Sequence, residues 1–147
     1  MAQRCLGARV WVEGRQVAGI GRGLCAFCAV ASGDGAADVR YLADKLAALR
    51  VFPRGDRLRM EAGLTEVGGE ILLVPNFTLF GDVRRGRRPD FGAAAPAEHG
   101  RALLGELAAA LRSAGVAVQE GIFGADMRVE VDNDGPVTIL LDSARLF

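Results

Sequence analysis

Ile71-Leu72-Leu73-Val74-Pro75-Asn76-Phe77-Thr78 joins an uninterrupted apolar run to a polar ending. Gly68-Gly69 precedes the run, and its four apolar residues are enough for a central strand. The end of such a strand would present Asn76, Phe77 and Thr78. Within a strand, Asn76 and Thr78 would point to one side and Phe77 to the other.

Further strands and two helices are expected on either side of this run. Apolar alternation and run length predict strands over residues 9–12, 16–20, 24–31, 116–122, 127–131 and 137–141. One helix is expected over about 37–49, with an apolar face made of Val39, Leu42, Leu46 and Leu49. A second helix follows Pro96 and ends at Gly115, with an apolar face made of Leu103, Leu107 and Leu111.

Two helices are too few for a doubly wound α/β sheet. We therefore expect an α+β fold with mostly antiparallel, curved, barrel-like sheets and both helices packed outside. The chain shows no internal repeat or linker, so residues 1–147 are expected to form one domain.

Composition excludes several classes of function. The formal net charge is zero, so any contact with RNA must be local rather than driven by the whole-protein field. No apolar run approaches the length of a membrane span, and no secretory segment follows the N-terminus. We expect a cytoplasmic protein with no membrane partner.

Cysteine and histidine usage argues against metal and cofactor chemistry. Cys25 and Cys28 form a C-x-x-C, but they lie in an apolar strand-like run and are expected to be small buried residues. The single histidine, His99, has no second ligand or triad pattern around it and is expected on a solvated helix face. We expect no metal site, no cofactor and no histidine base.

Two segments carry polar groups that suit ester chemistry. Asn76, Thr78 and a free Phe77 backbone N–H could polarise an ester carbonyl and stabilise a developing oxyanion, although a plain strand terminus would also explain them. Residues 133–138, Asn-Asp-Gly-Pro-Val-Thr, could form a rigid corner whose carbonyl oxygens hydrogen-bond an amino group and crowd one side of a chiral carbon. The alternative for that segment is a hairpin turn between two strands.

A third segment is strongly basic. Arg84, Arg85, Arg87 and Arg88 fall within five residues of a long glycine- and arginine-rich stretch. Such a cluster could follow phosphates, or it could be a solvated loop, and the residues alone favour neither.

Taken in order, these motifs and others resemble the D-aminoacyl-tRNA deacylase family over essentially the whole chain. The matching segments are Gln3-Arg4, Val12-Glu13-Gly14, Ile20-Gly21-Arg22-Gly23-Leu24, Tyr41-Leu42-Ala43-Asp44-Lys45, Leu49-Arg50-Val51-Phe52, Val67-Gly68-Gly69-Glu70, Phe77-Thr78-Leu79, Gly86-Arg87-Arg88-Pro89, Phe123-Gly124-Ala125-Asp126-Met127 and the 133–138 segment.

The resemblance implies hydrolysis of the ester between a D-amino acid, or glycine, and the 3′ end of tRNA. It implies a homodimer whose Gly135-cisPro136 corner enters the partner's pocket and excludes L-amino acids. It places Arg4 in support of the corner, and Met127 and Asn133 near the pocket. It favours tRNA contact as the role of the arginine cluster. Backbone groups and the substrate's own 2′-hydroxyl would carry much of the catalysis; an older view makes Thr78 a nucleophile, but no base is evident for it.

The chain departs from the family at the first catalytic motif. Pro75 and Asn76 stand where the family has Ser and Gln, which removes a hydroxyl and a backbone donor and shortens the amide's reach. A related animal deacylase that acts on mischarged L-alanyl-tRNA also has proline there, so a retuned substrate is one alternative. A non-catalytic tRNA-binding dimer is another.

Overall fold

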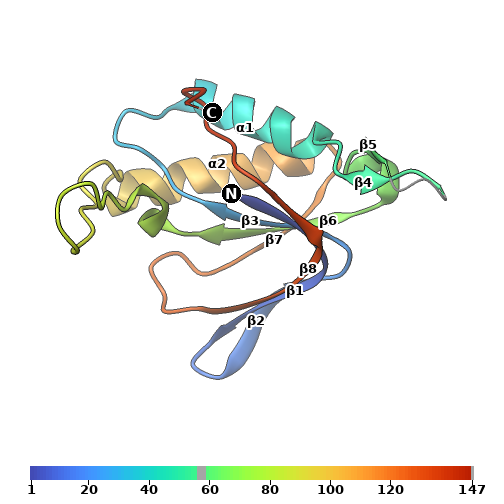
Figure 1. Ribbon diagram of the computed structural model, residues 1–147, viewed down its shortest axis with the longest axis horizontal. Helices are drawn as coiled ribbons and strands as arrows, with labels where there is room; N and C mark the ends of the chain where they lie inside the picture. The colour runs from blue at the N-terminus through green and yellow to red at the C-terminus, as the bar shows by residue number, and fades with distance from the viewer. Residues whose placement is uncertain (56–58, 147) are drawn as a thin grey trace.

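Strand β1, Ala2–Val12, pairs with three other strands of the main sheet. Its first half pairs antiparallel with β3 (Gly23–Cys28), and its second half with β2 (Arg15–Ile20). Its other edge pairs antiparallel with β8 (Arg128–Ile139) along nearly its whole length. The computed structural model describes residues 1–55 and 59–146, and Figure 1 shows β1, β2 and β8 curving away below the helices.

The other half of the sheet is parallel. Strand β6 (Glu70–Pro75) lies between β3 and β7 (Ala117–Glu120) and runs parallel to both. Parallel neighbours need crossover connections, which α1 (Ala36–Ala48) and α2 (Ala97–Ser113) provide. A separate two-stranded ribbon is formed by β4 (Phe52–Pro53) and β5 (Met60–Ala62).

The apolar run 71–74 is buried on both faces, as expected of a central strand. Ile71 and Leu73 pack under the two helices, in a core that also holds Phe52 and Leu111. Leu72 and Val74 point to the opposite face and form a second core inside the curved sheet. Alternation of side chains along a strand explains why four consecutive residues had to be apolar.

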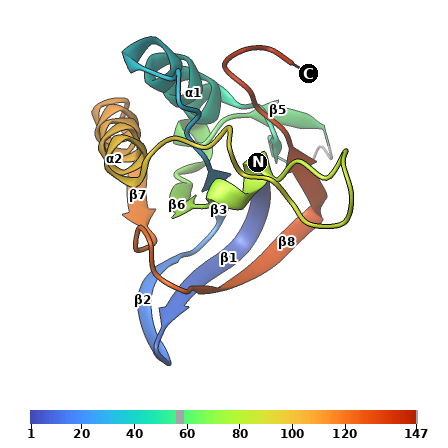
Figure 2. The ribbon, with the colours of Figure 1, turned by 90° about the vertical axis from the view of Figure 1, so that its left-hand side faces the viewer.

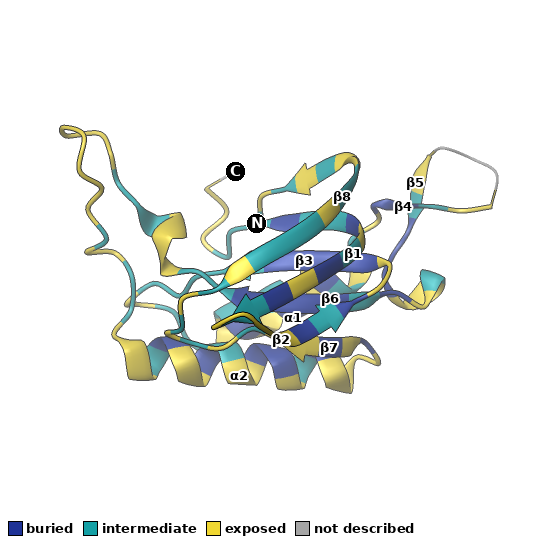
Figure 3. Ribbon diagram, turned by 90° about the horizontal axis from the view of Figure 1, so that it is seen from below, coloured by how far each residue is buried: buried dark blue, intermediate teal, exposed yellow. Residues whose placement is uncertain are grey.

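Both helices cover the same face of the sheet, as Figure 2 shows, so the predicted α+β architecture with two outside helices is confirmed. Each helix has a set of buried residues, and Figure 3 shows those of α2 interspersed with exposed ones. The predicted helices over 37–49 and after Pro96 are also confirmed, each to within a residue or two of its ends. Neither helix, nor any other in the described part of the chain, is long and apolar enough to cross a membrane.

The alternative of a hairpin turn at residues 133–138, between separate strands over 127–131 and 137–141, is wrong. Residues 128–139 form one strand, because both halves pair with β1 rather than with each other. Gln3 lies opposite Thr138 and Cys5 lies opposite Asn133, so residues 134–137 bulge out of the ladder opposite Arg4. The turn-like residues therefore make a wide bulge within a strand.

Gly23 lets β3 and β6 approach each other closely, so a side chain at this position should destabilise the fold. A Cβ at this position would lie 1.9 Å from the Glu70 carbonyl oxygen, whereas one at Gly21 would meet only the Glu70 side chain at 3.6 Å. We expect Gly23→Ala to lower the free energy of unfolding by about 3 kcal/mol or more, through forced backbone displacement. Gly21→Ala should change it by no more than about 0.5 kcal/mol. Urea titration of the two variants checks this, and equal midpoints would contradict it.

Candidate active site

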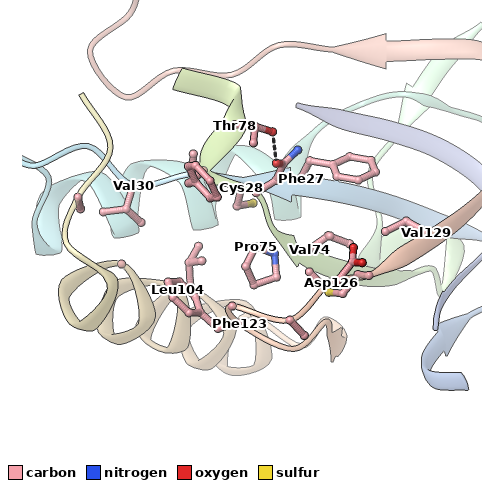
Figure 4. A pocket seen from close by; sticks show the side chains of 18 residues that line it. Phe27, Cys28, Val30, Val74, Pro75, Thr78, Leu104, Phe123, Asp126 and Val129 are labelled. Atoms are coloured by element: carbon pink, nitrogen blue, oxygen red, sulfur yellow. Dashed lines mark hydrogen bonds between the residues drawn. The ribbon is translucent and has the colours of Figure 1, made fainter. Parts of the chain in front are cut away.

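A cavity of about 410 Å³ opens where three parallel strands end. Parallel strands bring their carboxyl ends to the same edge, so the segments that follow them become neighbours. The walls include residues 27–30 at the end of β3, residues 74–78 at the end of β6 and residues 123–127 after β7, together with Gly100 and Leu104 of α2. Figure 4 shows Thr78 on one side of the cavity and Leu104 and Phe123 on the other.

Strand β6 ends at Pro75, and residues Phe77–Phe80 turn into a short 3-10 helix. The expectation that Asn76 and Thr78 alternate with Phe77 along a strand is therefore wrong. The turn instead brings Asn76 and Thr78 together, and the Thr78 hydroxyl donates a hydrogen bond to Asn76 Oδ1 (Figure 4). The backbone N–H groups of Phe77 and Thr78 donate no hydrogen bond within residues 1–55 and 59–146, since they begin the helix.

This arrangement supplies hydrogen-bond donors, and the hydrogen-bond partner of the Thr78 hydroxyl is an amide oxygen rather than a side-chain base. The Thr78 hydroxyl donates its hydrogen bond to the oxygen of a neutral amide, and a neutral amide is too weak a base to deprotonate the hydroxyl. Two unpaired N–H groups side by side can instead stabilise negative charge on an oxygen in the cavity. The geometry therefore suits polarisation of a carbonyl group better than attack by Thr78.

Among the residues that the structure describes, two titratable side chains line the cavity, Cys28 and Asp126, and neither is an activated nucleophile. Burial raises the pKa of the Cys28 thiol to about 11, so the sulfur stays protonated near neutral pH. Asp126 is exposed and lies on the β8 side of the cavity, beside Val129 in Figure 4. As expected, Cys25 and Cys28 are free cysteines in an apolar strand, with Cys25 fully buried.

Aromatic rings and glycines shape the rest of the cavity. Phe77 is 58% exposed and meets Phe91 edge-on, with ring centroids 5.2 Å apart. A Cβ at Gly100 would lie 3.4 Å from the Phe123 ring, and a Cβ at Gly121 would lie 2.9 Å from Met127 Sδ. Both glycines therefore make room for side chains of the cavity wall.

The Gly135-Pro136 corner forms a second cluster. Its peptide bond is cis. Arg4, whose side chain is 12% exposed, places Nε 2.8 Å from Asp134 Oδ2 and donates from Nη1 to the Val51 carbonyl at 2.6 Å. Asn133 Nδ2 donates to the carbonyls of Arg4 at 2.9 Å and Val137 at 3.2 Å. The bulge is thus tied to β1 from both sides, while Gly135 and Pro136 are exposed.

The structure therefore divides the residues singled out from the sequence into separate groups. Pro75, Asn76, Phe77, Thr78 and Met127 meet in the cavity. The corner group, made of Arg4, Asn133, Gly135 and Pro136, does not line the cavity of its own chain.

The arginine cluster sits on a hairpin closed by Asp82 and Asp90, whose backbones exchange hydrogen bonds of 2.8 and 2.9 Å. Arg84 is bound by the Asp82 carboxylate through Nε and Nη2, and this contact lowers the pKa of Asp82 to about 2. Among the described residues, Arg85, Arg87 and Arg88 are exposed and make no ion pair. Three of the four guanidinium groups are thus available to a partner.

Several cavity residues had not been identified from the sequence. Phe27, Leu104, Phe123 and Asp126 face the cavity only because of the way the strands and α2 are arranged. The Phe123–Met127 motif was the one sequence signal for two of them. The expectation that His99 lies on a solvated helix face is also wrong, because the residue is half-buried and its Nε2 hydrogen-bonds the Asp34 carbonyl oxygen at 2.9 Å. Within the described ranges, no group of three or more His, Cys, Asp or Glu side chains could hold a metal ion.

Comparison with known proteins connects this cavity to one family. A family model described as D-Tyr-tRNA(Tyr) deacylase matches residues 1–142. The D-aminoacyl-tRNA deacylase of Anaeromyxobacter dehalogenans is 51% identical over 147 residues, covering 100% of this chain and 98% of the relative. That of Syntrophobacter fumaroxidans is 45% identical with the same coverage.

Solved structures agree in fold. A protein described as c-Myc DNA Unwinding Element Binding Protein superimposes with a TM-score of 0.90 at 34% identity, covering 96% of this chain and 95% of that one. A probable eukaryotic D-amino acid tRNA deacylase gives a TM-score of 0.76 at 20% identity, covering 91% and 92%, and shows the fold alone.

The raised pKa of Cys28 predicts slow thiol chemistry. In a Cys5→Ala/Cys25→Ala variant, alkylation of Cys28 by iodoacetamide should accelerate about tenfold per pH unit above neutrality and level off near pH 11. The raised pKa also means that this thiol's contribution to stability is complete below about pH 8.5 and is lost as the pH rises through 11. Mass spectrometry measures the labelling, with the urea-unfolded chain as control. Rapid labelling of the folded protein at pH 7.5 would contradict the assignment.

Proposed function

The chain belongs to the D-Tyr-tRNA(Tyr) deacylase family, and from this premise we propose that it hydrolyses D-aminoacyl-tRNA, and glycyl-tRNA, in the cytoplasm. It is an ester hydrolase that separates a D-amino acid from tRNA. The observation that carries the proposal is the cavity at the end of β6, lined by Phe77 and Thr78, whose backbone N–H groups donate no hydrogen bond within residues 1–55 and 59–146.

The reaction needs polarisation of the ester carbonyl and attack by water. In the proposed complex, the carbonyl oxygen accepts hydrogen bonds from the N–H groups of Phe77 and Thr78, with Asn76 Nδ2 as a further donor. Water adds to the carbonyl carbon, and the bond to the ribose oxygen breaks with that oxygen taking up a proton. The substrate's 2′-hydroxyl assists the proton transfer, which is consistent with Thr78 being engaged by Asn76.

Selection against L-amino acids requires the Gly135-Pro136 corner, which lies outside the cavity of its own chain. We propose that a second copy of the chain supplies its exposed corner to this cavity in a homodimer. The corner is preorganised for this role, because Arg4 and Asn133 fix the backbone on both sides of it. Its carbonyl oxygens would bind the amino group and leave no space for an L side chain.

The direct test is release of amino acid from charged tRNA. Purified protein should liberate D-tyrosine from D-tyrosyl-tRNA and spare L-tyrosyl-tRNA in a single-turnover assay. Equal rates on both enantiomers would end the chiral-selection proposal. Binding of tRNA without ester cleavage would support the non-catalytic alternative, and preference for L-alanyl-tRNA would indicate that Pro75 and Asn76 have retuned the site.

Gly135 offers a test of the corner by itself. Its φ of +120° disfavours a side chain, and a Cβ would lie 2.7 Å from Val137 Cγ2 and 3.0 Å from Arg4 Nη2. Gly135→Ala should therefore displace the corner and lower the ratio of D- to L-tyrosyl-tRNA hydrolysis by roughly tenfold or more, about 1.4 kcal/mol of discrimination.

Gly14→Ala is the matched control for this variant. Gly14 also has a positive φ, +77°, but a Cβ there meets nothing within 4 Å. An alanine with positive φ but without a side-chain clash would therefore be placed away from the corner, and the D-to-L ratio should be unchanged. A Gly135→Ala enzyme with wild-type selectivity would show that the corner is not the selecting element.

The hairpin arginines should contribute to tRNA affinity through phosphates. Replacing Arg85, Arg87 and Arg88 by Gln should raise KM for charged tRNA and flatten its salt dependence, by about 0.9 in log–log slope per lost contact. Arg84→Gln is the comparison, because Asp82 already pairs with this charge and its loss should matter less. KM measured from 50 to 200 mM salt tests this, and unchanged slopes would place tRNA elsewhere.

A further inference from the structure

Arg101 stands at the rim of the cavity with an unpaired charge. Its Cζ atom lies 4.8 Å from the centre of the Phe123 ring, and Phe123 lines the cavity. The residue is exposed, and over residues 1–55 and 59–146 it makes no ion pair. A guanidinium stacked on a ring keeps its in-plane N–H donors free for an anion.

The two ends of the cavity differ in chemistry. The proposed ester-binding groups at Asn76–Thr78 are on one side, and Phe123 and Leu104 are on the other (Figure 4). Asp126 is the one carboxylate that the described part of the chain contributes to the lining, and it lies toward β8 and away from Leu104. A substrate with an ester at one end and a negative group at the other would therefore extend from Thr78 toward Phe123, where the Arg101 guanidinium stacks on the ring.

We propose that Arg101 binds the phosphodiester one nucleoside away from the ester, on the 5′ side of the terminal nucleotide. The inference rests on the proposed function and adds a specificity determinant to it. An Arg–phosphate contact is charge-assisted and can be bidentate, so it fixes the direction in which the nucleic acid leaves the cavity. It makes the enzyme favour esters of an oligonucleotide over esters of a single nucleoside.

Two small substrates separate this contact from the rest of the site. D-tyrosyl-adenosine carries the ester without a phosphate, and the D-tyrosyl ester of the dinucleotide CpA adds the one phosphodiester. For the wild-type enzyme, kcat/KM should be higher on the dinucleotide ester. Arg101→Gln should lower kcat/KM on the dinucleotide ester by roughly tenfold, mainly through KM, and leave the adenosine ester within about twofold.

Arg112→Gln is the matched control on the same helix. Arg112 donates to Glu120 Oε1 at 2.8 Å and to the Val118 carbonyl at 3.1 Å, so its charge is already engaged away from the cavity. It should leave the ratio of the two substrates unchanged. Gln at position 101 keeps an aliphatic stem over Phe123, and urea unfolding verifies that the variant is folded.

The outcomes discriminate between the two proposals. Equal loss on both substrates would mean that Arg101 acts only by supporting Phe123, and no loss on either would mean that it does not contact the phosphate; both overturn the inference while leaving the deacylase activity intact. A wild-type enzyme that hydrolysed neither ester nor D-tyrosyl-tRNA would overturn the proposed function itself, and the inference with it.

Discussion

Parallel pairing between β3 and β6 positions the groups of the candidate site. The two strands can approach so closely because Gly23 has no Cβ to meet the Glu70 carbonyl. Their carboxyl ends therefore finish side by side, and Asn76 N–H hydrogen-bonds the Cys28 carbonyl at 2.7 Å. Strand β7 extends the same edge, where Gly121 N–H bonds the Leu73 carbonyl at 2.8 Å. The cavity is the space beyond this edge, closed by the first turns of α2.

The chemistry available at this edge comes mainly from the backbone. The Thr78 hydroxyl is committed to Asn76, the Cys28 thiol is held protonated by burial, and His99 bonds a loop carbonyl outside the cavity lining. Apart from the exposed Asp126 carboxylate, what remains are fixed N–H groups whose position does not depend on a rotamer or a protonation state. Preorganised donors of this kind stabilise developing charge without rearranging, so an ester with its own neighbouring hydroxyl is a suitable substrate.

The corner and the cavity are held in place by different parts of the fold, and this separation matters for how two chains would assemble. Arg4 couples the corner to β1 and to the Val51 carbonyl, whereas the cavity depends on β3, β6 and α2. In a single chain the corner and the cavity are therefore two separate clusters, and the corner residues do not line the cavity. The proposed dimer would bring the corner of one chain to the cavity of the other. Arg101, in its proposed role, would determine where the nucleic acid enters.

The sequence by itself determined the central strand, both helices, the residues of the 75–78 and 133–138 motifs, and the family. These follow from local apolar periodicity and from the order of residues along the chain. It did not determine that β8 is continuous, since only pairing with β1 decides whether Asn133–Thr138 turns back or bulges. The 3-10 turn at Phe77, the pairing of Arg84 with Asp82, and the opposite wall at Leu104 and Phe123 were likewise decided by tertiary structure. Some of these features depend on the local turn that the chain takes after a strand, and others on contacts between residues far apart in the chain. Such turns and contacts leave no periodic signal in the sequence.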